Sequence, residues 1–398
     1  LEVHFIRRLR SPSSRLDRAR RHLGRPTSVR VRRWASWHRA RLRSLAPGHE
    51  ARLTEELERA LPTGTNLVEN ERFLIDHRID AALSDAPFAA QERVILIAAA
   101  RAGLPTCASI LSFDNITTRP PLPIAFDRYL VWNRFNEDEI LRSYLGVEPG
   151  QVSIVGAAQF DFYGDPTYVE DRSAWRARKG LAEEPTLLYG AGPPEVAPHE
   201  LQYVEHLCQA IDDGDLPADL RIVLRRHPVD FPERWDPVRH HPALVFDDAG
   251  ALGTTPGRPG QVNIGRQQIV DLCSALAHTD VHVSVSSTMT LDGAFFSKPQ
   301  IGPAYDDNPG SPHRRMAADL YRREHFVPIV ASGGMELATS RTELLAQVRR
   351  ALAEPARLEP QRRAMLQALC TYTDGACTDR VAEEITRFLA ALPGRARP

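Results

Sequence analysis

The amino-acid sequence predicts an α/β protein whose parallel sheets are covered by helices on both faces. Short apolar runs alternate with segments of helical periodicity along the chain, which is the pattern of β–α–β units. With 398 residues and 42% apolar content, the chain exceeds what one compact core usually holds, so we expect two domains. Charged residues make up 25% of the sequence, and it lacks an uninterrupted apolar run of about 18 residues, which indicates a soluble chain without a membrane-spanning helix.

The first half of the sequence contains the elements of an N-terminal domain, which we assign to residues 1–160. Residues 1–60 fit a basic helical segment and a linker. The apolar patterns that follow predict strands over 80–84, 106–111, 128–132 and 152–155, and helices over 91–101 and 135–145. Because the sequence starts without Met and without a preceding strand, we interpret this domain as truncated, with its first strand units missing.

The second half predicts a C-terminal domain over residues 161–375. Its expected strands are 186–189, 220–224, 243–246, 281–285 and 300–301, and its expected helices are 201–211, 267–278, 289–296, 342–353 and 361–392. The turn residues Gly164-Asp165-Pro166 break the periodicity, so the domains join between Gly156 and Asp171. Residues 376–398 are expected to form a helix that crosses back to the N-terminal domain.

The charge distribution is uneven along the chain. Residues 1–43 contain 14 arginines against Glu2 and Asp17, a charge of +12 that leaves −13 for the remainder. Such a segment suits contact with an anionic membrane or a polyanionic acceptor. The alternative is an Arg-rich, solvated helical face in a chain whose only lysines are Lys179 and Lys298.

The cysteines and histidines do not predict a metal site. The five cysteines are widely spaced without a C-x-x-C pair, which fits a reducing cytoplasm and neither a disulfide framework nor a zinc site. His240-His241 and Asp247-Asp248 lack ligand spacing on one helical face. No secretory signal pattern is visible, and we expect no metal.

Polar residues follow two of the predicted strands where each strand ends. Arg225-Arg226-His227-Pro228 comes after the strand at 220–224, and Ser286-Ser287-Thr288 comes after the strand at 281–285. In an open α/β sheet, ligands collect at the carboxyl ends of strands, and the start of a helix there favours a phosphate. The two motifs predict a site for a diphosphate, although His227 could simply end an edge strand and the hydroxyls could simply cap the next helix.

Glycines follow a third strand in Tyr189-Gly190-Ala191-Gly192-Pro193-Pro194. Gly190 and Gly192 would let the backbone approach the same ligand closely, or would form only a tight turn before a helix. A third glycine and a suitably placed acidic residue are missing, which argues against an NAD site. The Gly-Lys-Ser/Thr of a P-loop is absent from the sequence, which removes the simplest kinase or ATPase interpretation.

In the order and spacing of these motifs, the chain resembles the glycosyltransferase-B superfamily over most of residues 75–390. The His-Pro at 227–228 and the Ser-Ser-Thr at 286–288 are similar to the pair shared by bacterial sialyltransferases, capsule Kdo transferases and CDP-glycerol glycerophosphotransferases. The segments 112–118, 130–133 and 155–161 are similar to bacterial surface-polysaccharide proteins with a Ser-Trp-Asp-Asn loop. The resemblance implies two Rossmann-like α/β/α domains that face each other across a cleft.

The resemblance also implies roles for residues on the donor side. His227 would contact the donor phosphate and protonate it as the nucleotide leaves, which suits an imidazole with a pKa of roughly 6.5. Ser286, Ser287 and Thr288 would bind the same phosphate, with Arg225 beside them, and Asp292 would reach the ribose hydroxyls. Family members often have Glu near the position of Asp292, which makes that match less specific.

Carboxylates in the first half are candidates for the general base. Asp114, next to Asn115, could deprotonate an acceptor hydroxyl, as an inverting transfer requires, and Asp85 is a second candidate after the first predicted strand. The alternative for each is a turn residue whose side chain bonds its own backbone.

We therefore expect a bacterial glycosyltransferase that moves a sugar or a polyol phosphate from a nucleotide-sugar or CDP-polyol donor to a glycan or lipid-linked acceptor of a surface polysaccharide. Two alternatives stay open: a nucleotide-sugar 2-epimerase of the same fold, and a noncatalytic polysaccharide-assembly protein. The donor is a substrate, so no cofactor is expected, and neither is nucleic acid. The His-Pro and Ser-Ser pair favours cytidine over uridine nucleotides. The expected location is the cytoplasm, with peripheral contact at the inner membrane face through the basic segment.

Overall fold

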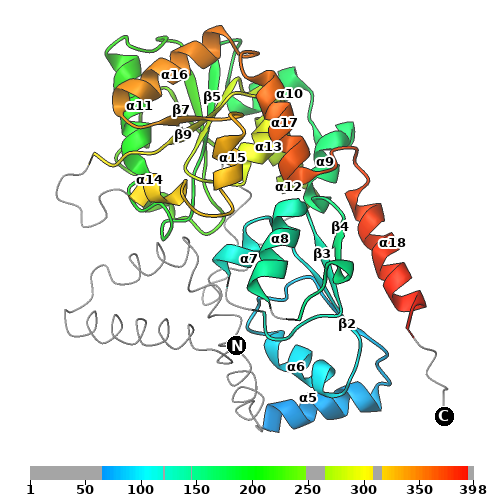
Figure 1. Cartoon of the computed structure of the whole chain (residues 1–398). Helices are drawn as coiled ribbons and strands as arrows, with labels where there is room; N and C mark the ends of the chain where they lie inside the picture. The colour runs from blue at the N-terminus through cyan, green and yellow to red at the C-terminus, as the bar shows by residue number, and fades with distance from the viewer. Residues whose placement is uncertain (1–64, 120–121, 145, 248–264, 308–315, 393–398) are drawn as a thin grey trace. The chain divides into compact units, whose positions relative to one another are not determined.

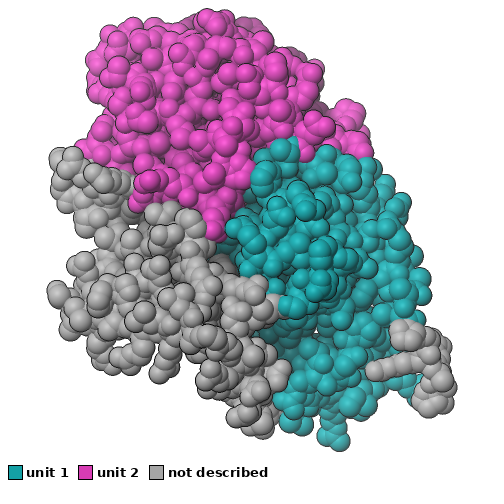
Figure 2. Space-filling model, viewed as in Figure 1, with its two compact units in different colours: residues 1–158, 368–372, 376–398 teal, residues 159–367, 373–375 magenta. Residues whose placement is uncertain are grey.

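The chain forms two compact units (Figure 2). A computed structural model describes residues 65–119, 122–144, 146–247, 265–307 and 316–392, so the predicted basic segment 1–60 lies outside the described residues. Unit 1 holds the described residues up to Ala158 together with Ala368–Tyr372 and the chain from Ala376 onward. Unit 2 holds Gln159–Gln367 and the short stretch Thr373–Gly375.

Unit 1 is built on a four-stranded parallel sheet with the strand order β1-β2-β3-β4 (Figure 1). The strands are β1 (Ala82–Ser84), β2 (Thr106–Ser109), β3 (Arg128–Val131) and β4 (Val152–Ile154). The helices before and between them are α5 (Thr65–Asp76), α6 (Arg93–Arg101), α7 (Asn115–Thr118) and α8 (Arg134–Ser143), and the 3-10 helix η1 (Pro149–Gln151) precedes β4. Each predicted strand of this half is present.

The two faces of this sheet are buried by different parts of the chain, because alternate strand residues point to opposite faces. One face packs against α6 and α8, in a core that includes Leu96, Ala108, Tyr129, Val131 and Ile140. The other face packs against α18 (Cys377–Ala390), in a core that includes Cys107, Leu130, Val155, Val381, Ile385 and Phe388. Helix α18, the last that the structure describes, therefore completes the core of unit 1.

The segment before α18 is fastened to the ends of β3 and β4. Asn133 Nδ2 donates a hydrogen bond to the carbonyl of Leu369 (2.5 Å), and Thr371 Oγ1 donates one to the carbonyl of Trp132 (2.9 Å). Gly156 has φ +83° and lies so close to this segment that an added Cβ would be 2.7 Å from Cys377 Sγ. A residue with a side chain would therefore disturb the junction at Gly156.

Unit 2 has a six-stranded parallel sheet in the order β10-β9-β8-β5-β6-β7. Its strands are β5 (Thr186–Gly190), β6 (Arg221–Arg225), β7 (Leu244–Asp247), β8 (Val281–Ser284), β9 (Gln300–Pro303) and β10 (Glu336–Ala338). Numbered from β5, this is the order 6-5-4-1-2-3 of a doubly wound Rossmann sheet. The direction of strand addition reverses between β5 and β8.

Helices cover both faces of this sheet, as Figure 1 shows. The core around α11 (Leu201–Asp212) and α16 (Arg341–Ala353) buries alternate residues of the central strands, among them Leu187, Tyr189, Ile222, Leu224, Val281 and Val283. The remaining elements are η2 (Ala158–Phe160), α9 (Asp161–Gly164), η3 (Pro166–Tyr168), α10 (Arg172–Lys179), η4 (Pro232–Trp235), α12 (Arg266–His278), α13 (Met289–Phe295), α14 (Met316–Leu320), α15 (Val327–Ala331) and α17 (Glu359–Cys370).

Both sheets use the same device where two parallel strands begin. In unit 1, Asp127 Oδ2 accepts hydrogen bonds from the backbone N–H and the hydroxyl of Thr106 (2.8 and 3.0 Å). In unit 2, Asp280 Oδ2 accepts the same two bonds from Thr186 (both 2.8 Å). Each Asp immediately precedes a strand that pairs with the strand started by the Thr, so the carboxylate fixes the register of the pair.

The prediction of one helix over 361–392 is wrong. The structure has two helices there, α17 and α18, separated by a break in which Thr371 has φ +65° and Gly375 has φ +74°. The break lies where the chain passes between the two units. Several other elements were not predicted, among them α5, α10, whose sequence is rich in arginine, and the edge strand β10, which is only three residues long.

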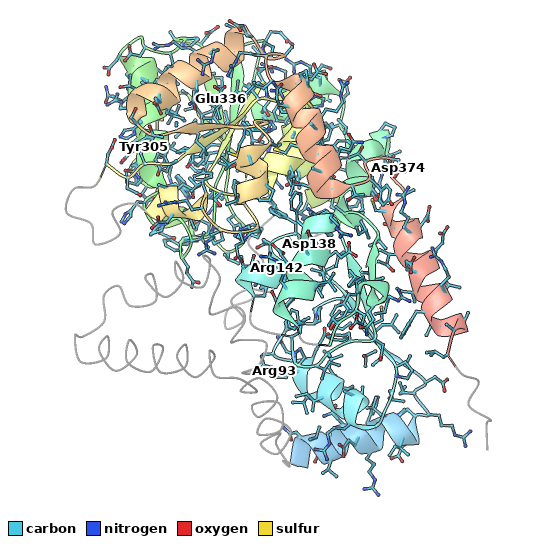
Figure 3. The ribbon with its side chains drawn as sticks, viewed as in Figure 1. Arg93, Asp138, Arg142, Tyr305, Glu336 and Asp374 are labelled. Carbon is cyan, nitrogen blue, oxygen red and sulfur yellow. The ribbon has the colours of Figure 1, made fainter. Side chains whose placement is uncertain are left out.

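Charged side chains occupy the solvent sides of both units (Figure 3). Asp138 and Arg142 are exposed on α8 in unit 1. Glu336, on the edge strand β10 of unit 2, forms ion pairs with Arg350 (2.6 Å) and Arg357 (2.5 Å). Charge on an edge strand discourages pairing with another chain.

Candidate functional site

The carboxyl ends of three neighbouring strands, β8, β5 and β6, lie side by side in unit 2. Gly190, the last residue of β5, pairs with Arg225 of β6 on one side and with Ser284 of β8 on the other. Ligands of doubly wound sheets bind beside the point where the strand order reverses, and here that point lies between β5 and β8. The loops that leave this edge carry the residues singled out in the sequence, Gly192, His227, Ser286, Ser287 and Thr288.

His227 follows β6 and is half-buried, and its backbone neighbour decides its tautomer. The N–H of Val229 donates to His227 Nδ1 (3.2 Å), so a neutral ring carries its proton on Nε2. This Nε2 makes no hydrogen bond to the residues that the structure describes. Burial lowers the pKa of His227 below 6.5, with Arg234 adding to the effect and Asp230 opposing it. The ring is therefore a neutral N–H donor at neutral pH.

The three residues after β8 differ in what their side chains do. Ser286 has φ +45°, its N–H donates to Tyr321 Oη (3.1 Å) and its hydroxyl donates to the carbonyl of Leu320 (3.4 Å), so both groups are used inside unit 2. Ser287 Oγ accepts from the N–H of Met289 (3.2 Å), which leaves its own hydrogen available. Thr288 Oγ1 makes no hydrogen bond within the described part of the chain. Ser287 and Thr288 are the half-buried residues with hydroxyl hydrogens free to bind a ligand.

Gly190 at the end of β5 and Gly192 after it have different surroundings. A Cβ added at Gly190 would lie 2.5 Å from Met289 Sδ, so the space at Gly190 is filled by a methionine side chain of the same unit. A Cβ added at Gly192 would meet Ala197 Cβ at 3.7 Å, which is an ordinary contact. The N–H of Gly192 donates to both carboxylate oxygens of Glu200 (2.9 and 3.1 Å).

A buried polar network, which the sequence patterns did not reveal, ties the loop after β5 to the loop after β6. Arg234 donates to Glu200 Oε2 (3.2 Å), to the carbonyl of Gly192 (3.1 Å) and to Asp230 Oδ2 (3.4 Å). Trp235 Nε1 donates to the same oxygen of Asp230 (2.8 Å). Burial raises the pKa of Glu200 to about 8, and Arg234 and the N–H of Gly192 oppose that rise. The network holds Gly192 and His227 on adjacent loops.

Arg225 is buried at the end of β6. Its guanidinium forms an ion pair with the buried Asp247, which also pairs with Lys179. The three side chains link the ends of β6 and β7 to α10. The contacts of the Arg225 guanidinium thus lie within unit 2, and its place beside the donor phosphate stays a prediction.

Asp292 on α13 is only 5% exposed, and its Oδ1 has no hydrogen-bond partner among the described residues. Burial raises the pKa of Asp292 to about 7, while a hydrogen bond from Tyr163 and the charge of Arg225 oppose the rise. A carboxyl with such a pKa can accept or donate a proton near neutral pH. The ribose contact suggested by the resemblance stays a prediction.

The two carboxylates predicted as general bases belong to unit 1. Asp114 precedes α7, where its Oδ1 accepts from Ser112 Oγ (2.5 Å) and Asn115 Nδ2 (3.2 Å), and its Oδ2 accepts from Thr118 Oγ1 (2.9 Å). Asp85 follows β1 and is exposed. Asp114 thus has local partners for both oxygens, but these are side chains and not the backbone groups of its turn alternative. A role as base stays a prediction for both residues.

Neither a metal centre nor a membrane span is found within the described ranges. No three His, Cys, Asp or Glu side chains come together there as ligands. His241 Nε2 instead lies 3.2 Å from Asp212 Oδ1. Among the same residues, no helix combines the length and the hydropathy needed to cross a bilayer.

Similarity to known proteins is structural. No protein-family model matches the sequence, and no curated protein matches it. MnaA of S. aureus in complex with UDP has a TM-score of 0.54 at 14% identity, with 82% of this chain and 80% of that chain covered. A putative UDP-N-acetylglucosamine 2-epimerase of Listeria monocytogenes has a TM-score of 0.54 at 12% identity, covering 82% and 79%. UDP-GlcNAc 2-epimerase of Neisseria meningitidis bound to UDP-GlcNAc has a TM-score of 0.52 at 10% identity, covering 81% and 80%.

At these identities the similarity shows the fold alone. It confirms the predicted fold class, an α/β chain with two Rossmann-like domains of the glycosyltransferase-B type.

Proposed function

We propose that this chain, which has the glycosyltransferase-B fold, is an enzyme that acts on a nucleotide-activated sugar bound at the carboxyl ends of β8, β5 and β6. The observation that carries the proposal is the set of unused donors there: His227 Nε2–H after β6 and the hydroxyls of Ser287 and Thr288 after β8. Strands β6 and β8 flank β5, so the two groups of donors are separated by about 10 Å, a span that a bound nucleoside diphosphate can bridge.

The reaction we favour is transfer of the sugar, or of a polyol phosphate, to a hydroxyl of a surface-polysaccharide acceptor. In sugar transfer, a base takes the proton of the acceptor hydroxyl, whose oxygen bonds to the anomeric carbon. The bond from that carbon to the diphosphate breaks, and its electron pair moves to the leaving oxygen. Hydrogen bonds from His227, Ser287 and Thr288 would stabilise the charge that develops on the diphosphate. Asp114 and Asp85 are the proposed candidates for the base.

Epimerisation at C2 of the sugar is the second candidate. It is favoured by two of the three structures of similar fold named above, a putative UDP-N-acetylglucosamine 2-epimerase and a UDP-GlcNAc 2-epimerase bound to UDP-GlcNAc. This reaction removes and returns a proton at C2, which needs groups that can both accept and donate a proton. The hydrogen-bond donors of His227, Ser287 and Thr288 would bind the nucleotide of the epimerase substrate as well, so their arrangement is compatible with either reaction.

Calorimetric titration with CMP, CDP, UDP and GDP tests the proposed site. We expect one nucleotide to bind selectively, and His227→Ala and Ser287→Ala each to weaken it about tenfold, because each removes one hydrogen bond to a charged group. Ser286→Ala should have a smaller effect, since its hydroxyl donates to Leu320. His240→Ala, at an exposed histidine of unit 2, is the matched control. If none of the four nucleotides binds, the proposed site is wrong.

Product analysis then separates the reactions. Conversion of UDP-GlcNAc to its C2 epimer without an acceptor supports epimerisation. Release of nucleotide together with a longer glycan, only when an acceptor is present, supports transfer. Selective binding with neither product supports a noncatalytic polysaccharide-assembly protein.

The acceptor and the membrane contact are proposals that rest on charge. Residues 1–43 carry +12, which suits a position near anionic lipid or a polyanionic glycan. Pelleting with liposomes tests the membrane contact: binding should rise with the anionic lipid content and fall with added salt. Pelleting that does not depend on the anionic lipid content would contradict the membrane contact and leave the proposed nucleotide site unaffected.

A further inference from the structure

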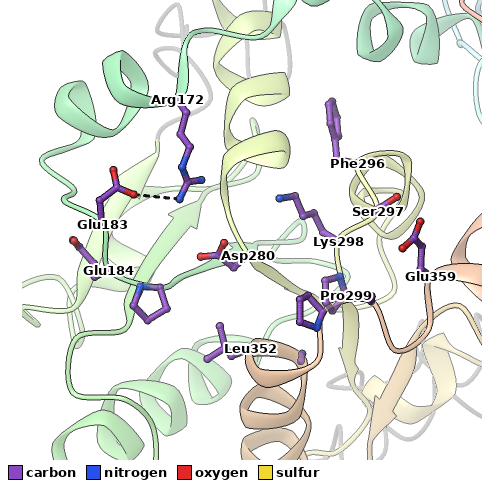
Figure 4. Close-up of a pocket in the computed structure, with 14 residues that line it drawn as sticks. Arg172, Glu183, Glu184, Asp280, Phe296, Ser297, Lys298, Pro299, Leu352 and Glu359 are labelled. Carbon is purple, nitrogen blue, oxygen red and sulfur yellow. Dashed lines mark ion pairs between the residues drawn. The ribbon is translucent and has the colours of Figure 1, made fainter.

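A cavity of about 550 Å³ lies in unit 2 at the edge of the sheet opposite the proposed nucleotide site (Figure 4). Pro185, Asp280 and Pro299 line it, and they immediately precede β5, β8 and β9. The five residues of β5 span about 16 Å, so this cavity is separate from the loops at the carboxyl ends. Its volume falls within the range of small-molecule sites.

Lys298 supplies a positive charge to this cavity without a partner of its own. It is one of two lysines in the sequence, and the other, Lys179, pairs with Asp247. The ammonium of Lys298 makes no hydrogen bond and no ion pair within 4 Å to any residue that the structure describes. Figure 4 shows it extending into the same space as the guanidinium of Arg172. Burial lowers the pKa of Lys298, Arg172 lowers it further, and Asp280 opposes them.

The carboxylates around the cavity have other partners, so they do not neutralise Lys298. Asp280 Oδ2 accepts both bonds from Thr186, and Glu359 pairs with Arg363 (2.9 Å). Two more acidic side chains pair with arginines at longer range: Glu183 with Arg172 at 3.8 Å, and Glu184 with Arg176 and Arg221 at 4.0 Å. Lys298 and Arg172 therefore line the same cavity, and Lys298 has no acidic partner within 4 Å among the described residues.

Other features of the wall fit the rest of a ligand. Phe296, Pro299 and Leu352 give the cavity an apolar lining beside the two cations. Arg172 Nη1 donates to the carbonyl of His278 (2.9 Å), which holds the guanidinium in place. Ser297, next to Lys298, has φ +56°, a conformation that non-glycine residues seldom adopt outside functional or strained sites.

We propose that this cavity binds a small organic anion, a carboxylate or phosphate ester with an apolar body, whose anionic group lies between Lys298 and Arg172. The anion would give Lys298 a partner and would add a closer one to Arg172, whose ion pair with Glu183 is 3.8 Å long, and the apolar body would lie against Phe296, Pro299 and Leu352. This site is independent of the nucleotide site, because none of its lining residues lies on the loops after β5, β6 or β8.

Calorimetric titration of the full chain with phenyl phosphate tests the site, with benzoate as the carboxylate arm. We expect one molecule to bind per chain, and Lys298→Gln and Arg172→Gln each to lower the affinity about tenfold. Arg322→Gln removes an equal charge from an exposed side chain of unit 2 outside the cavity and should leave the affinity unchanged. Inorganic phosphate should bind more weakly than phenyl phosphate. Binding of neither organic anion, or equal binding to the Lys298→Gln variant, overturns the proposal.

Chemical labelling gives a second readout in the unsubstituted protein. An amine-acetylating reagent followed by mass spectrometry can follow both lysines, and Lys179 serves as the internal reference. At about ten times its Kd, phenyl phosphate should slow acetylation of Lys298 about tenfold and leave Lys179 unchanged. UDP should not protect Lys298, which keeps this test apart from the nucleotide site. Equal labelling of Lys298 with and without phenyl phosphate would contradict the proposed site.

Discussion

In the proposed function, the neutral imidazole of His227 donates a hydrogen bond to a phosphate, because the N–H of Val229 leaves the ring proton on Nε2. Burial keeps its pKa below 6.5 in the free protein, and a bound diphosphate should raise that pKa. The complex then binds a proton that the free protein does not. We therefore predict that the affinity for UDP-GlcNAc rises as the pH falls from about 8 to about 6.

Calorimetry at several pH values measures this dependence. His227→Gln keeps an N–H donor but cannot titrate, so its affinity should be nearly independent of pH over the same interval. A pH dependence identical to that of the unsubstituted protein would show that His227 is not the responsible group.

The sequence offered candidate site residues only where a motif follows a predicted strand. His227, Ser287 and Thr288 were proposed in this way, and the structure leaves their donors unused among the described residues, while their role in binding stays a prediction. Glu200 and Arg234 were missed, because a charged residue inside a buried network has no distinguishing spacing in the sequence. The role of Gly190 was also missed, since the side chain that fills its space, Met289, is about 100 residues away in the sequence.

At the scale of elements, the contact between α13 and the strands β8 and β9 depends on one glycine. A Cβ added at Gly293 would lie 2.1 Å from His282 Nδ1 and 2.3 Å from Gln300 Nε2, both in buried side chains. We predict that Gly293→Ala lowers the free energy of unfolding by about 3 kcal/mol through overpacking. Gly192→Ala, where the nearest atom is 3.7 Å away, is the comparison and should cost less than about 1 kcal/mol. Urea unfolding measures both, and equal losses would contradict the steric explanation.

The strand β8 also contains a buried histidine that makes the unit sensitive to acid. His282 Nε2 lies 2.9 Å from Thr279 Oγ1, which donates to the carbonyl of Ala275, and His282 Nδ1 lies 3.2 Å from Gln300 Nε2. Burial, with Lys298 nearby, lowers the pKa of His282 to about 3. Below about pH 6.5, His282 is therefore protonated in the unfolded chain but stays neutral in the folded chain. The free energy of unfolding falls as the pH drops from about 6.5 to about 3.

This single group should account for a loss on the order of 4 kcal/mol across that interval. Urea unfolding at a series of pH values measures the loss. His282→Gln should unfold with a shallower pH dependence, whereas His240→Gln, at an exposed histidine, should keep the original one. The same slope in all three proteins would rule out His282 as the acid-sensitive group.

Most elements were predictable because buried parallel strands are short apolar runs and the helices between them are amphipathic. The prediction of elements failed where an element or its end is not marked by a periodic pattern of apolar residues. The break between α17 and α18 follows from the passage of the chain between units, while apolar residues on both sides continue a helical pattern. The edge strand β10 is three residues long and begins with Glu336, so it resembles a loop in sequence.

At the scale of the whole molecule, unit 1 depends on α18, a helix far from the strands of that unit in the sequence. Phe388 on α18 is 8% exposed and packs with Cys107, Leu130 and Val155 of the unit 1 sheet. We predict that Phe388→Ala destabilises unit 1 by about 3 kcal/mol. Leu389→Ala removes an apolar side chain that is 43% exposed on the same helix and should have little effect.

Hydrogen exchange followed by mass spectrometry localises the change. Protection should fall in β2, β3 and β4 and stay unchanged in β5, β6 and β8, because the latter belong to the other unit. A uniform loss across both sheets would show that the two units unfold as one.

The position of α18 in the sequence has a consequence for synthesis on the ribosome. Unit 2 occupies an almost continuous stretch, Gln159–Gln367. The core of unit 1, in contrast, is incomplete until the residues of α18 that pack in it have been synthesised, Val381, Ile385 and Phe388. The nascent chain can thus finish its second unit while one face of the first sheet, with Cys107 and Leu130, remains uncovered. At ordinary rates of translation, the time between the synthesis of β4 and that of α18 is on the order of tens of seconds. During this time the apolar face of the unit 1 sheet is a target for chaperones. A ribosome that stalls before residue 377 releases a chain that lacks α18, so the core of its first unit stays incomplete.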